Sequence, residues 1–367
     1  MNILIHDIAV KRNSGGVFTI LRQVYEAAKA DKKNNYIFVL GSKLFAETNT
    51  IKIVVREDLQ KNYIKRVLFD FGVGSKQLLE YNPDVVVSMQ NTSIFGLRKT
   101  KQYVYLHQPL PFQNAFHFVP WVKKEQKLFF YQYVVGSIIK LSLKWNRNSK
   151  VIVQSQWLKT ELLNRKIKKA EQIVVSYPKL SSTVRVNSQI QTNEKVITLF
   201  FPSTAMLYKN HRVVLNALDF LDKEHRDLVN VLFTLSKTEY SNLIGGTVPD
   251  QVKLLGRINH EKVLKILSRS TLIFPSQIES YGLPILEAKS LKRPMLVNNI
   301  PVLRETVGNY DDVHYFTGSS ASDLANEIVR MLKQKNTISE YVSENIDDSE
   351  VLEDLIKVIT GNSYDKK

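Results

Sequence analysis

The sequence predicts an α/β protein made of two doubly wound domains that face each other across a cleft. The chain has 367 residues, more than the roughly 250 to 300 at which a single hydrophobic core stops growing. Short β-rich segments alternate with stretches of suitable length for helices, and these segments are apolar throughout rather than at every second position. This is typical of parallel strands covered on both faces. A polar stretch rich in Ser and Asn at 179–195 separates two such series and is typical of a linker.

Each series supplies the strands of one domain. Seven strands are predicted in the first half, at 2–10, 35–41, 51–55, 84–90, 103–108, 150–155 and 172–177. Five are predicted in the second half, at 196–203, 229–236, 252–256, 271–276 and 294–299. The expected organisation is a Rossmann-like domain over 1–180, a linker over 181–194, a second Rossmann-like domain over 195–346, and a C-terminal helix and tail over 347–367. In open sheets of this kind, ligands bind beyond the carboxyl ends of the strands, so the loops after the strands are where functional residues are expected.

Composition restricts the class of protein. The chain contains no cysteine, which excludes disulfides and thiolate metal sites and suits a cytosolic protein. The first ten residues run directly into Lys11 and Arg12 and predict a buried strand rather than a signal peptide. The longest apolar segment, 128–143, is interrupted by Lys140 and is shorter than the ~20 residues that span a bilayer.

The net charge of +16 is unevenly distributed. Residues 1–180 hold 29 lysines and arginines against 12 aspartates and glutamates, whereas residues 181–367 hold 22 against 23. The first half therefore carries a charge of +17 and the second half −1. Such asymmetry indicates an anionic partner, either a phospholipid surface, a lipid-phosphate substrate or nucleic acid. A solvated basic face is the alternative.

The stretch "PSQIESYGLPILEAKSLKRP" at 275–294 places two carboxylates, Glu279 and Glu287, around a predicted helix start. Pro284 suits the first position of a helix, where its missing N–H costs nothing. The free N–H groups around Gly282 carry the positive end of the helix dipole and can bind a phosphate. Carboxylates on either side could accept hydrogen bonds from hydroxyls at both ends of a diphosphate ligand, which is the geometry of a sugar nucleotide. Two solvated glutamates on a surface loop and helix are the alternative.

The longer segment "FPSQIESYGLPILEAKSLKRPMLVNNIPVLRETVG" at 274–308 resembles the signature of retaining glycosyltransferase family 4, the group 1 transferases of the GT-B fold. The resemblance implies a hexosyltransferase whose first domain binds the acceptor and whose second domain binds a nucleotide-diphosphate sugar. It assigns the donor sugar to Glu279 and the ribose to Glu287. The donor-binding residues between them are Gly282, Leu283 and Pro284.

A second match is "FFPSTAMLYKNHRVVLNAL" at 200–218, where the family has an Arg and a Lys that clamp the donor diphosphate. Lys209 falls on the lysine, but Thr204 occupies the arginine position. Because a cation aimed at a leaving diphosphate is usually a large catalytic term, Arg212, one turn along the same predicted helix, is a candidate substitute; a solvated side chain is the alternative. Asn210 and Gly256 complete the predicted donor site.

Two features of the first half belong to the same resemblance. Gly15 and Gly16 open a predicted helix, and their N–H groups could contact a phosphate or sugar, although a tight turn explains them equally well. His107 ends a predicted strand and is assigned a catalytic role near the donor sugar, against the alternative of a structural histidine. Attack on the same face as the leaving phosphate, which the resemblance favours, needs no covalent nucleophile.

The stretch 121–145 combines lysines, aromatic residues and aliphatic residues in a predicted helix. It could lie on anionic lipid, but the sequence favours an apolar face buried in the core with only the lysines outside. A lipid-linked saccharide acceptor and a peripheral position on the inner face of the cell membrane would fit the basic half. We therefore expect a cytoplasmic enzyme of bacterial surface polysaccharide assembly.

Several other chemistries have no motif in this sequence. There is no phosphate-binding G-x-x-x-x-G-K-[ST] loop, no H-E-x-x-H, no G-x-S-x-G and no Asp-rich metal motif. We therefore expect no cofactor and no metal, with the nucleotide sugar as co-substrate. Two rivals remain: a catalytically silent GT-B subunit that stabilises another transferase, which Thr204 favours, and a nucleic-acid-binding protein. The second is disfavoured because the lysines are scattered and no nucleic-acid module is present, so no nucleic-acid partner is expected.

Overall fold

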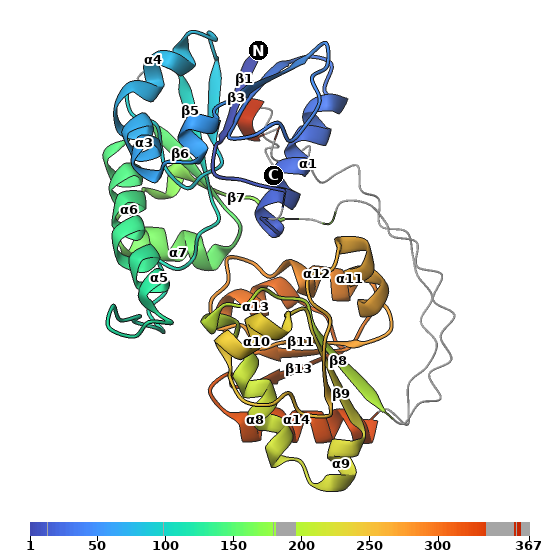
Figure 1. The fold of residues 1–367 in the computed structure, drawn as a ribbon. Helices are drawn as coiled ribbons and strands as arrows, with labels where there is room; N and C mark the ends of the chain where they lie inside the picture. The colour runs from blue at the N-terminus through green and yellow to red at the C-terminus, as the bar shows by residue number, and fades with distance from the viewer. Residues whose placement is uncertain are drawn as a thin grey trace. The chain divides into compact units, whose positions relative to one another are not determined.

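The computed structural model describes residues 1–12, 14–97, 99–178, 180, 196–334, 356 and 358–360. The chain divides into two compact units (Figure 1). Unit 1 comprises Met1–Trp121, Gln126–Ser181 and Asp348–Lys367, and unit 2 comprises Val122–Glu125 and Ser182–Asp347. The predicted linker 181–194 and most of the predicted segment 347–367 lie outside the described residues.

Unit 1 is built on a seven-stranded parallel sheet of order β3-β2-β1-β4-β5-β6-β7. Its strands are β1 (Asn2–Asp7), β2 (Asn35–Leu40), β3 (Ile51–Val55), β4 (Val85–Ser88), β5 (Lys101–Leu106), β6 (Ser149–Val153) and β7 (Ile173–Val175). β1 pairs with β2 on one side and with β4 on the other, so the strand order reverses between β1 and β4. This reversal is the topological switch point of a doubly wound sheet.

Helices connect these strands. They are α1 (Gly16–Ala30), α2 (Glu57–Gln60), α3 (Tyr63–Leu68), α4 (Gly74–Leu79), α5 (Gln126–Phe129), α6 (Gly136–Trp145) and α7 (Gln156–Asn164), with π-helical turns η1 (Phe69–Val73) and η2 (Phe130–Val135) and the 3-10 turn η3 (Ala170–Gln172). The helix predicted over 121–145 thus begins only at Gln126 and contains a π-turn.

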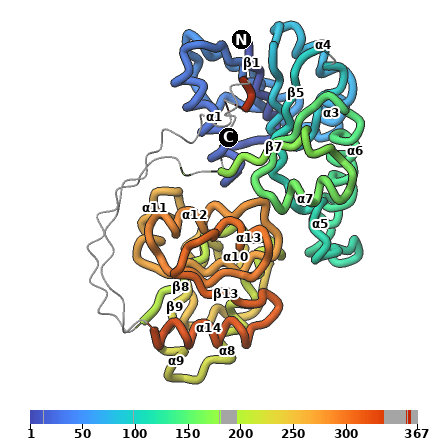
Figure 2. The backbone as a smooth tube through the Cα atoms, turned by 180° about the vertical axis from the view of Figure 1, so that it is seen from behind, coloured from blue at the N-terminus to red at the C-terminus, as the bar shows by residue number. Residues whose placement is uncertain are grey.

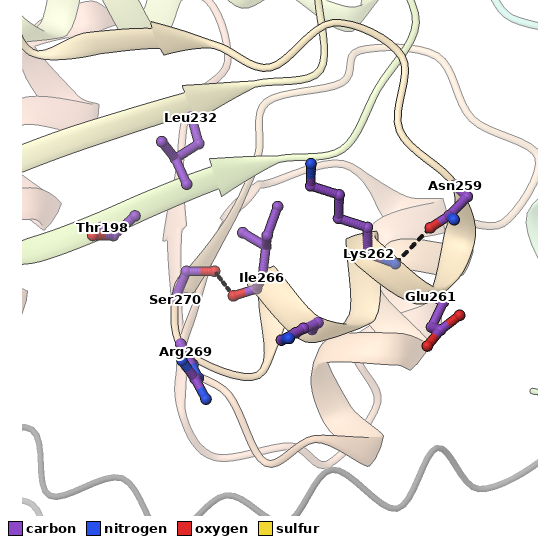
Figure 3. A pocket seen from close by; sticks show the side chains of 9 residues that line it. Thr198, Leu232, Asn259, Glu261, Lys262, Ile266, Arg269 and Ser270 are labelled. Atoms are coloured by element: carbon purple, nitrogen blue, oxygen red, sulfur yellow. Dashed lines mark hydrogen bonds between the residues drawn. The ribbon is translucent and has the colours of Figure 1, made fainter.

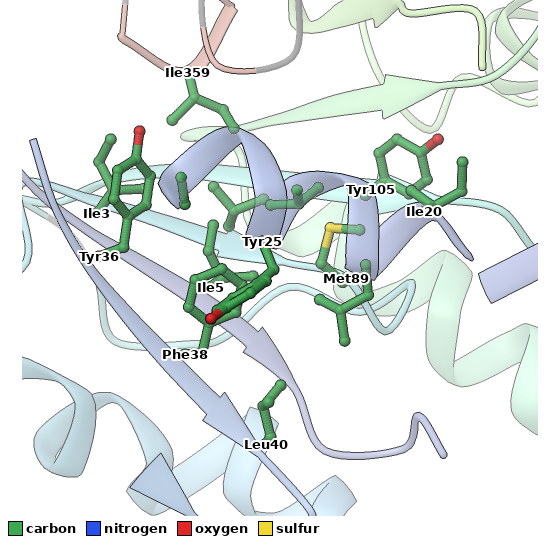
Figure 4. Close-up of a cluster of buried hydrophobic side chains, with 14 of the residues drawn as sticks. Ile3, Ile5, Ile20, Tyr25, Tyr36, Phe38, Leu40, Met89, Tyr105 and Ile359 are labelled. Atoms are coloured by element: carbon green, nitrogen blue, oxygen red, sulfur yellow. The ribbon is translucent and has the colours of Figure 1, made fainter. Parts of the chain in front are cut away.

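The buried side chains of β1, β2 and α1 form one core of unit 1 (Figure 4). Ile359 packs into this core, and the Tyr103 hydroxyl donates a hydrogen bond to the carbonyl oxygen of Val358 at 3.0 Å. The described part of the C-terminal segment, Ile356 and 358–360, is helical. The end of the chain therefore contributes to unit 1 although it follows unit 2 in sequence. Figure 2 shows this red segment beside the blue N-terminal strands.

Unit 2 is built on a six-stranded parallel sheet of order β10-β9-β8-β11-β12-β13, with its switch point between β8 and β11. The strands are β8 (Ile197–Phe201), β9 (Val229–Phe233), β10 (Val252–Leu254), β11 (Thr271–Phe274), β12 (Met295–Asn298) and β13 (Val313–Phe316). The connecting elements are η4 (Leu207–Lys209), α8 (His211–Phe220), α9 (Lys223–Asp227), α10 (Lys237–Leu243), α11 (His260–Leu267), α12 (Leu283–Ser290), α13 (Pro301–Val307) and α14 (Ala321–Gln334).

The predicted doubly wound α/β architecture is confirmed, and each of the twelve predicted strands overlaps a strand of the structure. β13 was not predicted. This strand lies at the edge of its sheet, its four residues include His314, and only Phe316 in it is fully buried, so it lacks a continuous apolar run. Within the described residues, no helix combines the length and apolar character that crossing a bilayer requires.

Candidate functional site

The candidate site of unit 2 lies where the sheet order reverses. The loops that follow β8 and β11 leave from neighbouring strands at the switch point, where doubly wound sheets bind ligands. These two loops are tied together, because the backbone N–H of Gln277 donates to the carbonyl oxygen of Tyr208 at 2.8 Å. The topology therefore brings the two sequence segments that resemble the family signature to one place.

Lys209 and Glu279 form an ion pair between these loops. Their side chains are only 16% and 13% exposed, and the Lys209 ammonium lies over the Phe274 ring, 5.7 Å from its centre. Burial by itself lowers the pKa of Lys209, but the Glu279 carboxylate and, to a smaller extent, Tyr208 raise it, so that the pKa lies above its ordinary value. Lys209 is therefore a charged, mostly buried cation with a fixed position.

Gly282 sets the start of α12 beside this pair. It has a φ of 111°, in the range that side-chain-bearing residues avoid, and a Cβ added there would come within 3.3 Å of Leu303. Pro284 lies in the first turn, and no side chain caps this end by a hydrogen bond. Orphan N–H groups at an uncapped helix start, together with the helix dipole, favour an anion.

Glu287 lies one turn into α12 and is mostly buried, with 9% of its side chain exposed. Its Oε1 is 2.8 Å from Nε2 of His260, the first residue of α11. His260 was not predicted as a site residue. A histidine that opens a helix after a strand was the available signal, but its pairing with Glu287 depends on packing of α11 against α12, which the sequence does not reveal.

A chain of hydrogen bonds fixes the loops at this edge of the sheet. Asn298, at the end of β12, donates from Nδ2 to the carbonyl oxygen of Ser276 at 3.0 Å and accepts from the N–H of Gly318 at 2.8 Å. Asn210 in turn donates from Nδ2 to the carbonyl oxygen of Gly318 at 2.7 Å. The loops after β8, β11, β12 and β13 are thereby linked. Asn298 was missed by the sequence analysis because an amide that serves only neighbouring backbone carries no motif.

The buried His211 contacts the loop after β8 through Ser203. Its Nε2 is 3.0 Å from the Ser203 hydroxyl, and its ring packs against Phe201 and Phe233. Burial lowers the pKa of His211 to about 3, with a smaller effect from Lys209. The imidazole is therefore neutral near pH 7 and adds no charge to the site.

Within the described residues, no hydrogen bond or ion pair joins three of the predicted donor-binding residues to Lys209 or Glu279. Thr204 is exposed in the loop after β8. The guanidinium of Arg212 donates to the carbonyl oxygen of Ile244 at 3.1 Å, at the end of α10. Gly256 follows β10, two strands away from β8, and has a φ of 66°. The Arg212 guanidinium is thus held at the end of α10, and its role as a substitute for the family arginine stays a prediction.

Unit 1 holds the remaining candidates at its own strand ends. Gly15 caps α1 with a φ of 58° and no side-chain hydrogen bond, and Gly16 is the first helical residue. His107 follows β5 and is held by Asn91, whose Oδ1 accepts from the His107 N–H at 2.8 Å and whose Nδ2 is 3.3 Å from Nε2. Burial lowers the pKa of His107 to about 4. Near pH 7 it is therefore neutral and suited to hydrogen bonding rather than to ion pairing.

Two buried carboxyl groups flank the switch point of unit 1. Asp7 ends β1, and burial raises its pKa to about 7 against weaker opposing hydrogen bonds to the backbone. Its Oδ2 has no hydrogen-bond partner within the described residues. Burial likewise raises the pKa of Asp70 to about 7, although Thr92 and Gln90 donate hydrogen bonds to it. Both groups are therefore expected to titrate near neutral pH.

An open pocket of about 600 Å³ also lies in unit 2, along α11 (Figure 3). Lys262, Lys265 and Arg269 contribute to its lining, and Ser270 immediately precedes β11. The pocket thus reaches the amino end of that strand, opposite the end where doubly wound sheets bind ligands. None of the predicted donor-binding residues lines it.

Solved structures with this architecture establish the fold class. They include WaaG, a glycosyltransferase involved in lipopolysaccharide biosynthesis, with a TM-score of 0.66, 11% identity and coverage of 98% of this chain and 100% of that one. Another is sucrose-phosphate synthase from Thermosynechococcus elongatus, with a TM-score of 0.67, 16% identity and coverage of 92% and 90%. The chain has the GT-B fold.

Sequence comparison finds a family model that matches the second unit. Residues 185–347, which include Lys209, Glu279 and Glu287, match the family model described as glycosyl transferases group 1. The serotype-specific mannosyltransferase WbdA of Escherichia coli is 36% identical over 93 residues, which cover 25% of this chain and 11% of that protein. The O-antigen chain mannosyltransferase RfbU of Salmonella typhimurium strain LT2 is 23% identical over 249 residues, covering 66% of this chain and 64% of that protein. The aligned region thus spans only about a tenth of WbdA and less than two thirds of RfbU.

Proposed function

We propose that the protein is a retaining, metal-independent glycosyltransferase that moves a hexose from a nucleotide-diphosphate sugar to a saccharide acceptor. The observation that carries this proposal is the Lys209–Glu279 pair beside the uncapped start of α12, at the switch point of unit 2. Pro284 has no N–H and the Ile285 N–H donates to the Gly282 carbonyl oxygen at 3.0 Å, so the N–H groups of Gly282 and Leu283 remain for a ligand at this helix start. Together with a fixed cation they form a site suited to a diphosphate. The match of residues 185–347 to group 1 transferases supports the same assignment.

In this proposal the diphosphate of the donor lies against the N–H groups of Gly282 and Leu283. The Lys209 ammonium transfers one hydrogen bond from Glu279 to a phosphate oxygen and stabilises the charge that develops as the leaving group departs. Glu279, released from Lys209, accepts a hydrogen bond from a sugar hydroxyl, and Glu287 binds the ribose. The acceptor hydroxyl attacks the anomeric carbon on the face from which the phosphate leaves. The new glycosidic C–O bond forms as the bond from that carbon to the phosphate oxygen breaks, and the hydroxyl proton passes to the departing phosphate. The anomeric configuration is therefore retained, and no covalent intermediate with the protein forms.

We assign the acceptor to unit 1, with Gly15, Gly16 and neutral His107 as its candidate contacts. A lipid-linked saccharide of a bacterial surface polysaccharide, met on the cytoplasmic face of the membrane, is the acceptor class we favour. The names of WbdA and RfbU, both mannosyltransferases, make nucleotide-activated mannose the first donor to test.

A catalytically silent GT-B subunit is the second candidate. It is favoured by the exposed Thr204 at the position of the family arginine and by the bond of Arg212 to Ile244. A silent subunit would not cleave the donor, whereas a transferase hydrolyses it slowly without acceptor.

The test begins with thermal shift of the purified protein against a panel of nucleotide sugars, because a ligand that binds only the native state raises the melting temperature. The donor selected in this way is then supplied with a chelator, and its hydrolysis and the anomeric configuration of any product are followed by NMR. Lys209→Met should abolish both the shift and the turnover, while Lys237→Met, at an exposed lysine of α10, should change neither. A nucleotide-induced shift without any turnover would favour the silent subunit. An inverted product or loss of turnover with chelator would contradict the stated mechanism.

A further inference from the structure

Unit 1 exposes two rows of large apolar side chains, one on each of two helical segments. The first segment is α3 with η1, where Ile64 and Leu68 are 69% and 61% exposed. The second is η2 with α6, where Trp145 is 62% exposed. The other exposed apolar residues of these segments are Val73, Phe130, Tyr131, Tyr133, Val134 and Leu141. We call these two rows together the α3/α6 face.

The two rows are neighbours in space. The Tyr63 and Phe130 rings are in edge contact, with their centres 6.3 Å apart. At the other end, Phe95 stacks on Phe71 of η1 and meets the Trp145 ring at 6.5 Å. Figures 1 and 2 both place α3 beside α6. The exposed residues therefore form one continuous face rather than scattered side chains.

The segment of η2 with α6 also has a core side, so exposure there is not a sign of poor packing. No residue of α3 itself is buried, and its segment reaches a core through Phe69 of η1. Val135, Ile139 and Leu143 are buried in a second core of unit 1. The expectation that the apolar residues of 121–145 are mostly core is thus only half right, because the segment has a buried apolar side and an exposed one. An exposed patch of this kind on a soluble protein marks an interaction site.

The charged residues of these segments indicate which partner binds the α3/α6 face. The two segments, 63–73 and 130–145, contain four basic residues, Lys65, Arg66, Lys140 and Lys144, and a single acidic residue, Asp70. The adjoining helices α4 and α5 add Lys76 and Lys127. Asp70 is buried, whereas Lys65, Lys76, Lys127 and Lys144 are exposed around the apolar rows. Aromatic and aliphatic side chains that enter the acyl boundary, with lysines that reach the headgroups, are typical of a helix lying in the surface of an anionic bilayer.

We propose that the α3/α6 face docks the protein on the anionic leaflet of a lipid bilayer, with both helical segments in the plane of the interface. Phe130, Val134, Leu141 and Trp145 on one segment and Ile64 and Leu68 on the other enter the lipid. The proposal extends the proposed function, since a lipid-linked acceptor is met at such a surface, but docking itself requires no sugar transfer.

The test is co-sedimentation of the full-length protein with vesicles of phosphatidylcholine alone and of phosphatidylcholine mixed with phosphatidylglycerol. The protein should bind the mixed vesicles and bind phosphatidylcholine weakly. Ile64→Ser combined with Leu68→Ser and Trp145→Ser should weaken binding about tenfold or more, since each apolar side chain adds to the buried area. Lys65→Glu with Lys144→Glu should weaken binding mainly at low salt.

The matched control is Phe220→Ser, which removes an equally exposed aromatic ring from α8 of unit 2 and should leave vesicle binding unchanged. Equal binding by the triple variant and the control would overturn the proposal, as would failure of the unsubstituted protein to bind mixed vesicles. A dimer in light scattering that becomes a monomer only in the triple variant would assign the face to a second copy instead. Donor hydrolysis in solution is measured separately, and it should survive the triple variant, so a failed docking result and a failed transferase assignment are distinguishable.

Discussion

A double-mutant cycle on Lys209 and Glu279 tests whether the pair is a buried, preorganised site. Lys209→Met leaves a mostly buried carboxylate without its cation, and Glu279→Gln leaves the ammonium without its anion. Breaking a fully buried pair costs about 3 to 5 kcal/mol and an exposed pair contributes about 0 to 1 kcal/mol. Since both side chains retain some exposure, 16% and 13%, we expect the free energy of unfolding of each single variant to fall by about 2 to 3 kcal/mol.

The double variant should be more stable than the sum of the single losses implies, with a coupling energy of about 2 kcal/mol, because it leaves no unpaired charge. For a unit of this size, each single loss corresponds to a decrease in melting temperature of about 5 to 10 °C. Thermal melts followed by circular dichroism measure the stability, and titration calorimetry with a nucleoside diphosphate measures the binding.

The double variant should affect the free energy of unfolding and the nucleotide affinity differently. The double variant regains stability but not nucleotide affinity, since its cation is gone. Lys237→Met controls for the loss of any surface lysine. Single-variant losses below about 0.5 kcal/mol would show that the pair is solvated, and the argument for a preorganised cation would fail.

Three further outcomes are expected. Gly282→Ala should lower the free energy of unfolding by about 1 to 3 kcal/mol in thermal melts and weaken nucleotide binding, because alanine is strained at the φ of 111° that Gly282 adopts. The control Gly246→Ala, at a φ of 73°, should lower the free energy of unfolding without changing nucleotide binding. Asn298→Ala should lose about 2 to 3 kcal/mol in the same melts, since it leaves a buried carbonyl and a buried N–H unpaired. Asp7 has a folded pKa of about 7, above its ordinary value, so its stabilising contribution is full in acid and is lost as the pH rises to 7. Melting temperatures at pH 5 and pH 8 should therefore differ less in Asp7→Asn than in the parent, while the exposed Asp227→Asn leaves the difference unchanged.

The sequence predicted the doubly wound fold because the signal is local. Continuous apolar runs such as 85–87 in β4 identify buried parallel strands without knowledge of their neighbours. β13 was not predicted because its four residues include His314 and only Phe316 is buried. The π-turns at 69–73 and 130–135 could not be predicted, since they depend on how each helix meets the core. They lie in the segments whose exposed side the sequence did not reveal.

The site was predictable to the extent that it lies at strand ends. The crevice rule placed Lys209 and Glu279 in loops after strands, but their direct pairing joins residues 70 positions apart and follows only from the strand order. The supporting residues His260 and Asn298 were missed for a different reason. Their contribution is to hold Glu287 and the loop backbone, and amide or imidazole groups with such roles have no fixed spacing in sequence.

Charge balance at the candidate diphosphate site leads to a final prediction. Lys209 and Glu279 neutralise each other, so in the free protein the pair adds no net charge, and the α12 dipole, equivalent to about half a charge, attracts an incoming diphosphate. Thr204 is exposed at the position where the resemblance expects an arginine. Thr204→Arg should therefore tighten nucleoside diphosphate binding about five- to tenfold at low salt and less at high salt. Ser241→Arg, at an exposed position of α10, adds the same charge away from the site and should have no comparable effect. Equal calorimetric affinities for the two arginine variants would show that the diphosphate lies out of reach of residue 204, and the alignment of this loop with the family clamp would then be wrong.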